Sequence, residues 1–355
     1  MVKLLVLPGD GIGPEIVGVS VVALSALDRR FGLDLELVHD EVGLASLARH
    51  ATTIRDEVIE MAEAVDGVIL GPLSMSDYPP KAEGGINASS RFRTGLDLYA
   101  NVRPSYVRRG VPATAPAMDL VIMRENLEGF YADRNMVVGT GELMPTKDVA
   151  LAIGKITTQG ARRIATAAFE RARRRRKQVT VVHKANALRV FYGFFLEVVG
   201  EVAKAYPDVA FDEVIVDAMA ALLVRTPERF DVVVTTNMFG DILSDEAAEL
   251  AGGLGLASSL NHGDDHAVAQ AAHGSAPDIA GQDRANPAAM LHSVAMLLEH
   301  LGAERQENAL VEAAACLVAT VDAMLTEPPT RTPDLGGELG TRAFGEAVAA
   351  GIENG

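Results

Sequence analysis

Two aspartates stand four residues apart in the segment Phe230–Leu250, which reads FDVVVTTNMFGDILSDEAAEL. At helical spacing, Asp241 and Asp245 project from the same face of a helix. Neighbouring carboxylates repel each other, and a hard divalent cation such as Mg²⁺ or Mn²⁺ offsets that repulsion because it prefers oxygen ligands. The simpler interpretation is that both decorate the N-terminal part of a helix, where the macrodipole favours negative charge. The spacing alone leaves both interpretations open.

Several basic and acidic residues stand where apolar, strand-like runs end. Ligands of α/β proteins gather beyond the carboxyl ends of strands. Guanidinium groups match carboxylates bidentately, and aspartates hold cations, so this residue set suits a metal-chelated polycarboxylate. Each residue taken singly is equally compatible with an ordinary surface charge. The residues are Arg103 before Pro104, Arg124 after Leu120–Met123, Lys184 after Val179–Val182 and Asp217 after Val214–Val216.

The elements that must position these residues follow an α/β pattern. Lys3–Leu7 predicts a buried strand, which a glycine loop connects to a helix through about Arg29. The loop glycines are spaced G-x-G-x-G, so the G-x-G-x-x-G fingerprint of the usual dinucleotide fold is not met. A turn at Gly240 and a helix from about Ile242 are expected after the strand Val232–Val234. Further helices are predicted over Ile54–Ala64, Thr157–Arg174, Val190–Ala205, Ala288–His300 and Ala309–Met324, and further strands over Leu35–Asp40 and Gly67–Leu70.

Length and composition limit the class of protein. A chain of 355 residues is long for one core, so two domains are expected. The net charge of −16 argues against nucleic acid as a partner. No apolar run approaches the ~20 residues of a membrane span, and the N-terminus lacks a signal-peptide pattern, so no membrane partner is expected. The single Cys316 cannot form an internal disulfide. These features predict a cytoplasmic protein.

Ordered blocks from about Val2 to about Ala349 resemble the β-decarboxylating dehydrogenase family, which includes isocitrate, 3-isopropylmalate, homoisocitrate and tartrate/D-malate dehydrogenases. The resemblance implies an α/β fold with two domains that differs from the usual Rossmann fold. Residues 1–98 plus 251–355 would form the first domain, on the cofactor side, and residues 99–250 the second, on the dimerisation and metal side. The blocks are GDGIGPEI, RTGLDLYANVRP, IMRENLEGFY, VHKANAL, DAMAALLV, NMFGDILSDEAAEL, HGSAPDIAG with ANP, and RTPDLGGELGT.

The same resemblance implies roles for individual residues. A divalent metal, Mg²⁺ or Mn²⁺, would be held by aspartates, and the substrate carboxylates by arginines. The family is dimeric with shared active sites, so Lys184 and Asp217 would serve the partner chain's site in a homodimer. The implied residues are Tyr131 and Lys184 for catalysis; Asn87, Ser89, Arg93, Arg103 and Arg124 for the substrate; Ile12, His273, Gly274, Ala276, Asp278 and Asn286 for the cofactor; and Asp217, Asp241 and Asp245 for the metal.

The resemblance also narrows the substrate and the cofactor. Isopropylmalate enzymes place a Glu and a Leu pair before the RTGLDLY block, whereas this chain has the polar segment Asn87–Phe92. A 3-substituted malate with a polar or anionic substituent, such as isocitrate, homoisocitrate, tartrate or malate, is therefore expected, with 3-isopropylmalate as the alternative. NADP-specific relatives carry Lys-Tyr where this chain has Asp278-Ile279, which favours NAD because a carboxylate repels the 2′-phosphate.

Two hypotheses from other classes of protein function are alternatives to a dehydrogenase. A metal-dependent phosphohydrolase or nucleotide-binding protein could use the same acidic cluster, but the chain has no Walker A loop. A family member that has lost catalysis could serve as a partner subunit. The presence of Lys184, Tyr131 and all three aspartates argues against that second reading.

Overall fold

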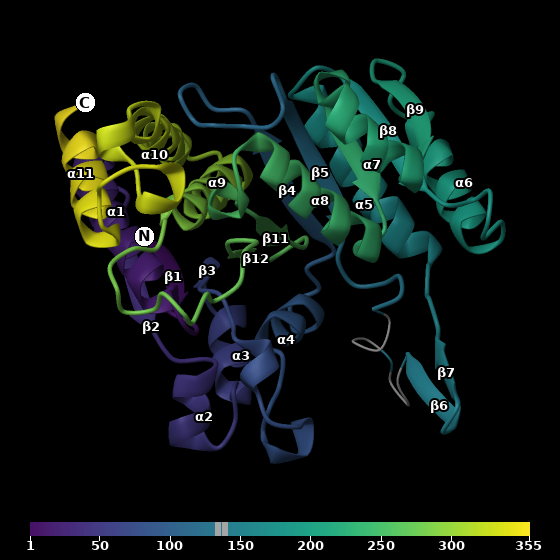
Figure 1. The fold of residues 1–355 in the computed structure, drawn as a ribbon, viewed down its shortest axis with the longest axis horizontal. Coiled ribbons are helices and arrows are strands. Elements are labelled where there is room, and N and C mark those ends of the chain that lie inside the picture. The colour runs from purple at the N-terminus through teal and green to yellow at the C-terminus, as the bar shows by residue number, and fades with distance from the viewer. Residues whose placement is uncertain (132–135, 137–140) are drawn as a thin grey trace.

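The computed structural model describes residues 1–131, 136 and 141–355. A mixed ten-stranded sheet runs through the centre, and helices cover both of its faces (Figure 1). The strand order is β2-β1-β3-β12-β11-β4-β5-β10-β8-β9. The strands are β1 (Val2–Leu7), β2 (Leu35–His39), β3 (Gly67–Leu70), β4 (Ala100–Tyr106), β5 (Asp119–Glu125), β8 (Gln178–His183), β9 (Ala210–Ile215), β10 (Val232–Thr235), β11 (Leu260–His262) and β12 (Ala267–Ala269).

Eleven α-helices accompany this sheet within the described residues. The long helices α1, α9, α10 and α11 lie together at the end of the molecule that also holds the chain termini (Figure 1). The bounds are α1 (Gly13–Phe31), α2 (Leu44–His50), α3 (Asp56–Glu63), α4 (Ala88–Gly95), α5 (Thr158–Arg173), α6 (Phe191–Ala203), α7 (Val216–Arg225), α8 (Asn237–Ala251), α9 (Ala288–Arg305), α10 (Asn308–Thr326) and α11 (Thr341–Asn354).

The sheet is built from two groups of strands that meet in its middle. The strands β1, β2, β3, β11 and β12 come from the first 98 and last 105 residues, and the other five come from residues 99–250. Within each group most pairs are parallel, while β11 and β4 meet in an antiparallel pair. This antiparallel β11–β4 pair, called the seam below, joins the groups into one continuous sheet. The α/β architecture expected from the sequence is confirmed, whereas the division into two domains stays a prediction.

Central strands are apolar on both faces because helices cover both sides. In β10, every residue of Val232–Thr235 is buried, and its neighbours β5 and β8 pair with it in parallel. Such strands read as continuous β-branched runs rather than as alternating patterns. The run Val232–Val234 therefore predicted the buried strand β10 correctly.

Three expectations were wrong in detail. Helix α8 begins at Asn237, so Gly240 lies inside its first turn and not in a turn before it. Arg103 lies in the middle of β4 rather than at a strand end. Asp217 lies in the first turn of α7 and not at the end of β9, which finishes at Ile215. In each case the local sequence pattern predicted the helix or strand correctly. Its first or last residue depended on contacts with distant parts of the chain, which a short stretch of sequence does not reveal.

A fourth expectation concerned membrane spans. Helix α10 has 19 residues and is apolar enough to cross a bilayer by length and composition, so the prediction that no apolar run approaches the length of a membrane span was wrong. The helix nevertheless packs between α9 and α11, with Leu310, Leu317 and Val321 buried in the core. An apolar helix in these surroundings is accounted for as a core helix.

One small element projects from the body of the molecule. The strands β6 (Glu142–Thr146) and β7 (Val149–Ala152) form an antiparallel hairpin apart from the main sheet (Figure 1). All of its strand residues are exposed, although Met144 and Leu151 are large and apolar. An isolated two-stranded hairpin is marginally stable alone in water, and its exposed Met144 and Leu151 leave apolar surface uncovered in the single chain.

Candidate active site

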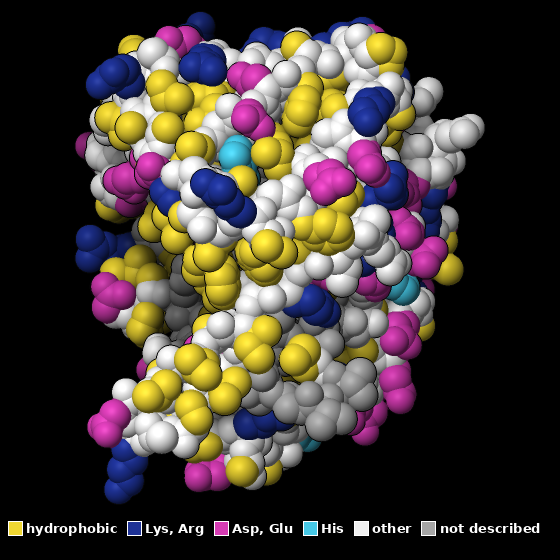
Figure 2. All heavy atoms as spheres, turned by 90° about the vertical axis from the view of Figure 1, so that its right-hand side faces the viewer, with side chains coloured by type: hydrophobic (Ala, Val, Ile, Leu, Met, Phe, Trp, Pro, Cys, Tyr) yellow, Lys and Arg dark blue, Asp and Glu magenta, His cyan; other side chains and the backbone are white. Residues whose placement is uncertain are grey.

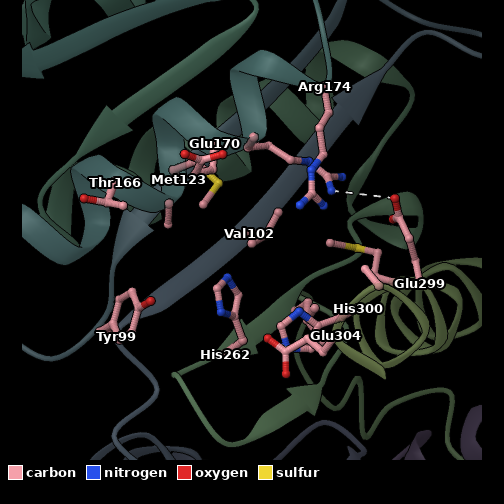
Figure 3. Close-up of a pocket in the computed structure, with 15 residues that line it drawn as sticks. Tyr99, Val102, Met123, Thr166, Glu170, Arg174, His262, Glu299, His300 and Glu304 are labelled. Carbon is pink, nitrogen blue, oxygen red and sulfur yellow. Dashed lines mark ion pairs between the residues drawn. The ribbon is translucent and has the colours of Figure 1, made fainter. Parts of the chain in front are cut away.

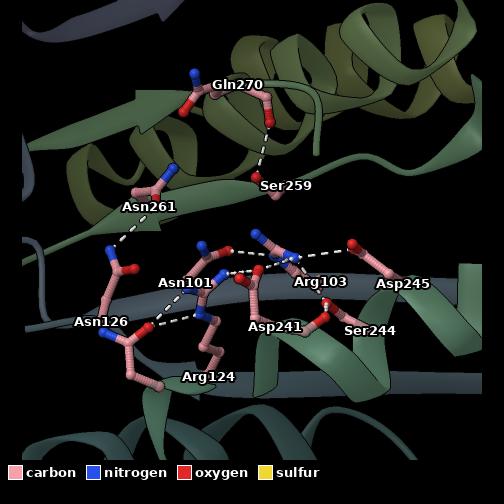
Figure 4. A network of polar contacts seen from close by, with 11 residues as sticks. Asn101, Arg103, Arg124, Asn126, Asp241, Ser244, Asp245, Ser259, Asn261 and Gln270 are labelled. Atoms are coloured by element: carbon pink, nitrogen blue, oxygen red, sulfur yellow. Dashed lines mark hydrogen bonds and ion pairs between the residues drawn. The ribbon is translucent and has the colours of Figure 1, made fainter. Parts of the chain in front are cut away.

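Two arginines and two aspartates from three elements meet on one face of the sheet (Figure 4). Arg103 Nη1 of β4 lies 3.2 Å from Asp241 Oδ1 and 3.3 Å from Asp245 Oδ1 of α8. Arg124 Nη1 of β5 also donates to Asp241 Oδ1. The predicted geometry of the aspartate pair is confirmed, since both carboxylates face the same guanidinium. We call these four residues the acid–arginine cluster.

Buried amide and hydroxyl groups hold the arginines in place. Arg124 is only 2 % exposed, and its Nε and Nη2 donate to Asn237 Oδ1 at 2.9 and 2.7 Å. Arg103 donates from Nη1 to Ser244 Oγ at 2.7 Å and from Nε to Asn101 Oδ1 at 3.3 Å. A buried guanidinium is costly unless it is paired, and here each one is paired with both neutral and charged acceptors.

Burial and the neighbouring charges both shift the pKa of Asp245 in this cluster. Burial raises the pKa of Asp245, the Arg103 guanidinium opposes that rise, and the neighbouring Asp241 carboxylate adds to it. A positively charged ligand between the two carboxylates would remove their mutual repulsion. The donor set of the cluster is therefore suited to a hard cation on the aspartate side and to an anionic ligand on the arginine side.

Lys184 and Asp217 form a second pair. Lys184 follows β8, as predicted, and its Nζ donates to Asp217 Oδ1 at the start of α7. The contact with Lys184 lowers the pKa of Asp217. Among residues 1–131, 136 and 141–355, no group of three acidic, histidine or cysteine side chains is arranged to hold a metal ion. Within one chain, Asp217 therefore does not join Asp241 and Asp245.

The remaining substrate candidates lie around helix α4. The Asn87 side chain caps this helix by accepting from Ser90 N at 3.0 Å. Ser89 Oγ lies 3.2 Å from Gln270 Oε1, to which it donates, and 3.0 Å from Gln270 Nε2, from which it accepts. Arg93 is half-buried in the same helix, whereas Arg91 points away and pairs with Asp56 on the surface. Tyr131, which is half-buried, is the last residue before the undescribed positions 132–135.

The glycine loop after β1 packs against the segment His273–Pro287. Ile12 N donates to Ser275 O at 2.8 Å, and Ser74 Oγ lies 2.7 Å from Ser275 Oγ. Gly11 has φ +56°, and a Cβ there would lie 2.0 Å from Ser275 O, so only glycine fits. The loop thus brings Ile12 next to the segment that carries the other cofactor candidates.

Within that segment the cofactor candidates differ in exposure. His273 Nδ1 lies 2.9 Å from Gly274 O, and burial lowers the pKa of His273. Its Nε2 has no hydrogen-bond partner within the described part of the chain. Ala276 has φ +38°, Asp278 is exposed, and Asn286 is buried and donates to Asp334 Oδ2 at 2.9 Å. An orphaned buried nitrogen beside an exposed loop leaves a polar position for a ligand.

The structure also shows polar residues around the candidate site that the sequence analysis did not identify. Asp10 is buried and accepts from Leu44 N, Ser74 N and Tyr78 Oη, which ties three loops together. Its position between two loop glycines was a usable signal, because a buried acid in such a loop must be bonded to backbone amides. Asn237 and Gln270 gave no local signal, since their partners come from distant parts of the chain.

The chain is similar to known proteins over nearly its full length. The sequence profile described as isocitrate/isopropylmalate dehydrogenase matches residues 3–348. The chain is 43 % identical over 353 residues to the isocitrate/homoisocitrate dehydrogenase of Thermus thermophilus and 39 % identical over 351 residues to the 3-isopropylmalate dehydrogenase of Archaeoglobus fulgidus, with 99 % of each chain covered in both cases.

The fold is similar as well. A crystal structure of isocitrate dehydrogenase from Methylococcus capsulatus superposes with a TM-score of 0.88 at 39 % identity, and all of both chains is covered. The phosphohydrolase and non-catalytic readings are set aside by these matches. The chain belongs to the isocitrate/isopropylmalate dehydrogenase family and is a decarboxylating dehydrogenase.

Proposed function

We propose that the protein is a cytoplasmic enzyme that uses NAD and a divalent metal to oxidise and decarboxylate a 3-substituted malate whose substituent is polar or anionic. The observation that carries the proposal is the acid–arginine cluster, in which Arg103 and Arg124 are almost completely buried beside Asp241 and Asp245. Guanidinium groups held this rigidly suit a ligand with several carboxylates.

The donor chemistry of the cluster fits Mg²⁺ or Mn²⁺. Asp241 and Asp245 offer carboxylate oxygens from successive turns of one helix, and both side chains are partly exposed. Asp217 of a second copy is the third acidic ligand in the proposal. When bound, the metal would act as a Lewis acid that favours ionisation of the substrate hydroxyl and stabilises the charge that remains after CO₂ departs.

The protein residues then bind the substrate and move protons. Arg93, Arg103 and Arg124 would hold the substrate carboxylates and so fix the orientation of the C2–H bond. Lys184 would accept the proton of the substrate hydroxyl. NAD⁺, when bound, would take up the hydride from C2 and become NADH. The C3–carboxylate bond breaks to release CO₂, and Tyr131 gives a proton to C3. The products are a 2-keto acid, CO₂ and NADH.

A homodimer completes the site in this proposal. Lys184 and Asp217 lie side by side, so one surface could deliver both to a second copy. Large apolar side chains are exposed nearby, including Val224 and Ile242, each 60 % exposed on α7 and α8. Figure 2 looks onto the side that carries α6 and β9 and shows hydrophobic side chains gathered between charged ones. Covering these surfaces and the β6–β7 hairpin would remove apolar area from water.

Two features support the choice of cofactor and substrate. Asp278 is exposed on the segment His273–Pro287, where a carboxylate suits ribose hydroxyls better than a phosphate. Ser89 of α4 and Gln270 form a hydrogen-bonded polar pair, and burying an isopropyl group against it would contribute little binding free energy. Because several relatives are named 3-isopropylmalate dehydrogenase, oxidation of that substrate is the alternative candidate.

One assay tests the proposal. Purified protein is stripped of metal with EDTA and supplied with NAD and isocitrate, homoisocitrate, D-malate, tartrate or 3-isopropylmalate, and then with Mg²⁺ or Mn²⁺. We expect stoichiometric NADH and CO₂ from a polar substrate only after metal is added back. A higher kcat/KM for 3-isopropylmalate would support the alternative candidate. Undiminished turnover in excess EDTA would contradict the role of the metal.

A further inference from the structure

A pocket of about 430 Å³ lies between α5 and α9 (Figure 3). Its floor is apolar and comes from the sheet, with Val102 of β4, Met123 of β5 and Leu260 of β11, and Met296 of α9 adds to it. The volume is within the range of small-molecule sites. Charged and imidazole side chains complete the walls.

The pocket is separate from the candidate active site. Successive residues of a strand point to opposite faces of the sheet. Val102 and Met123 line the pocket, while the adjacent Arg103 and Arg124 reach the aspartates of α8 on the other face. The pocket therefore lies behind the acid–arginine cluster, with the sheet between them.

Two arginines from α5 and its C-terminal end extend into the pocket. Arg171 and Arg174 both line the pocket, and Figure 3 shows the Arg174 side chain extending into it, on the side opposite His262 of β11 and His300 of α9. Arg171 Nη1 lies 3.8 Å from Glu299, which is too long for a hydrogen bond. Arg171 Nε is buried and has no hydrogen-bond acceptor within the described residues. Arg171 is thus incompletely satisfied by the described residues.

Three glutamates also line the pocket, and each of them is about half exposed to solvent. Glu170 is 49 % exposed and lies 3.5 Å from Arg173 Nη1, outside the pocket lining. Glu299 and Glu304 are each 50 % exposed at the rim, and Glu304 lies 3.7 Å from His300 Nε2. Burial and the nearby Arg174 and Arg171 charges lower the pKa of His300 to about 4, so its ring is neutral near pH 7. A neutral imidazole can still donate one hydrogen bond to an anion.

We propose that this pocket binds a small organic anion, a phosphate ester or a dicarboxylate, whose charged oxygens contact Arg171 and Arg174 and whose carbon skeleton lies on the apolar floor. Guanidinium groups recognise both kinds of oxyanion bidentately. The ligand would contact α5, from residues 99–250, and α9, from the last third of the chain, across the seam between β11 and β4. Binding at that position would hold the two strand groups together and stabilise the folded protein.

The proposal is tested by calorimetric titration of the full chain with glycerol 3-phosphate and, separately, with succinate, alongside thermal unfolding. The variants are Arg174→Gln and the matched control Arg162→Gln, which removes an exposed arginine elsewhere on α5. We expect at least one probe to bind and to raise Tm. Arg174→Gln should weaken that binding at least about tenfold, and Arg162→Gln should leave it unchanged.

Hydrogen exchange locates the bound probe. Amides of β11 and of the C-terminal half of α9 should gain protection with the probe in the wild type but not in Arg174→Gln. The two probes distinguish a phosphate-ester ligand from a dicarboxylate. Absence of binding by both at millimolar concentration would overturn the proposal, as would equal weakening by the two substitutions or protection confined to α8.

Discussion

Gly240 of α8 lies directly against Arg124 of β5. A Cβ atom on Gly240 would stand 2.6 Å from the Cβ and Cγ atoms of Arg124, closer than real side chains approach. The missing side chain lets the helix reach the strand, and it places the next residue, Asp241, at the Arg124 guanidinium. The absence of a side chain at Gly240 thus determines how closely α8, which carries Asp241 and Asp245, approaches Arg124 of β5.

The first prediction follows from that contact. Gly240→Ala should lower the free energy of unfolding by ~1–3 kcal/mol, because the new methyl group overpacks the interface between helix and strand. Turnover should fall with it, since α8 must move away from Arg124. The measurements are urea unfolding and NADH formation. Gly200→Ala on α6 is the control, because nothing lies within 4 Å of a Cβ there. It should be neutral or more stable by up to ~1 kcal/mol. Equal effects of the two substitutions would contradict the packing argument.

The second prediction concerns the proposed base. Lys184→Ala should reduce kcat by ~10²–10⁴. The folded state should persist, because the lysine is partly exposed and its partner Asp217 faces solvent. Steady-state kinetics and circular dichroism measure the two effects. Lys204→Ala removes an exposed lysine after α6 and should leave kcat unchanged. Near-normal turnover by Lys184→Ala would exclude the residue as the base.

The third prediction addresses cofactor choice. The wild type should prefer NAD over NADP by ~10²-fold in kcat/KM, a difference of about 2.7 kcal/mol. Asp278→Lys combined with Ile279→Tyr should narrow that gap, because the carboxylate is replaced by groups able to bind a 2′-phosphate. Asp265→Lys makes the same charge change in the exposed turn between β11 and β12 and should not alter the preference. Equal use of both cofactors by the wild type would refute the prediction.

The fourth prediction tests the polar pair that Ser89 of α4 forms with Gln270. Ser89→Leu should raise kcat/KM for 3-isopropylmalate relative to isocitrate by ~10-fold or more, since it places apolar surface beside the C3 substituent. Ser89→Ala serves as the control, because it removes the hydroxyl that bonds Gln270 without adding a large apolar group. The substrate panel described above provides the measurement. An unchanged ratio in Ser89→Leu would show that Ser89 does not contact the substituent.

The fifth prediction is a pH dependence of stability. Burial is the main cause that lowers the pKa values of His262 and His300 to about 4, and their ring centroids lie 4.9 Å apart. Between about pH 6.5 and pH 4 the unfolded chain binds protons that the folded chain does not, so stability falls as the pH falls through that window. The loss is roughly 3 kcal/mol for one histidine.

Urea unfolding at several pH values between 4 and 8 measures this dependence. His300→Gln should flatten the curve across the window, because the folded state no longer excludes that proton. His50→Gln, which replaces an exposed histidine at the end of α2, should leave the slope as it is. A wild-type curve without slope between pH 6.5 and pH 4.5 would contradict the prediction.

The sequence by itself identified much of the protein. The run Val232–Val234 and the aspartates at positions 241 and 245 predicted a buried strand followed by a helix with two acids on one face, and both exist. The ordered blocks indicated the family and the α/β fold. These signals succeeded because periodicity, β-branched runs and motif spacing act over short stretches of chain.

The tertiary structure alone decided how those pieces meet. Arg103 lies in mid-strand, yet it reaches Asp245 because β4 passes beneath α8, 142 residues away in the sequence. Arg91, in a polar segment expected to face the substrate, instead pairs with Asp56 on the surface. The pocket behind the sheet combines side chains of α5, α9 and β11 that share no local pattern. Such contacts depend on how whole helices and strands pack against one another. A short stretch of sequence cannot predict that packing, because the contacting residues lie far apart in the chain.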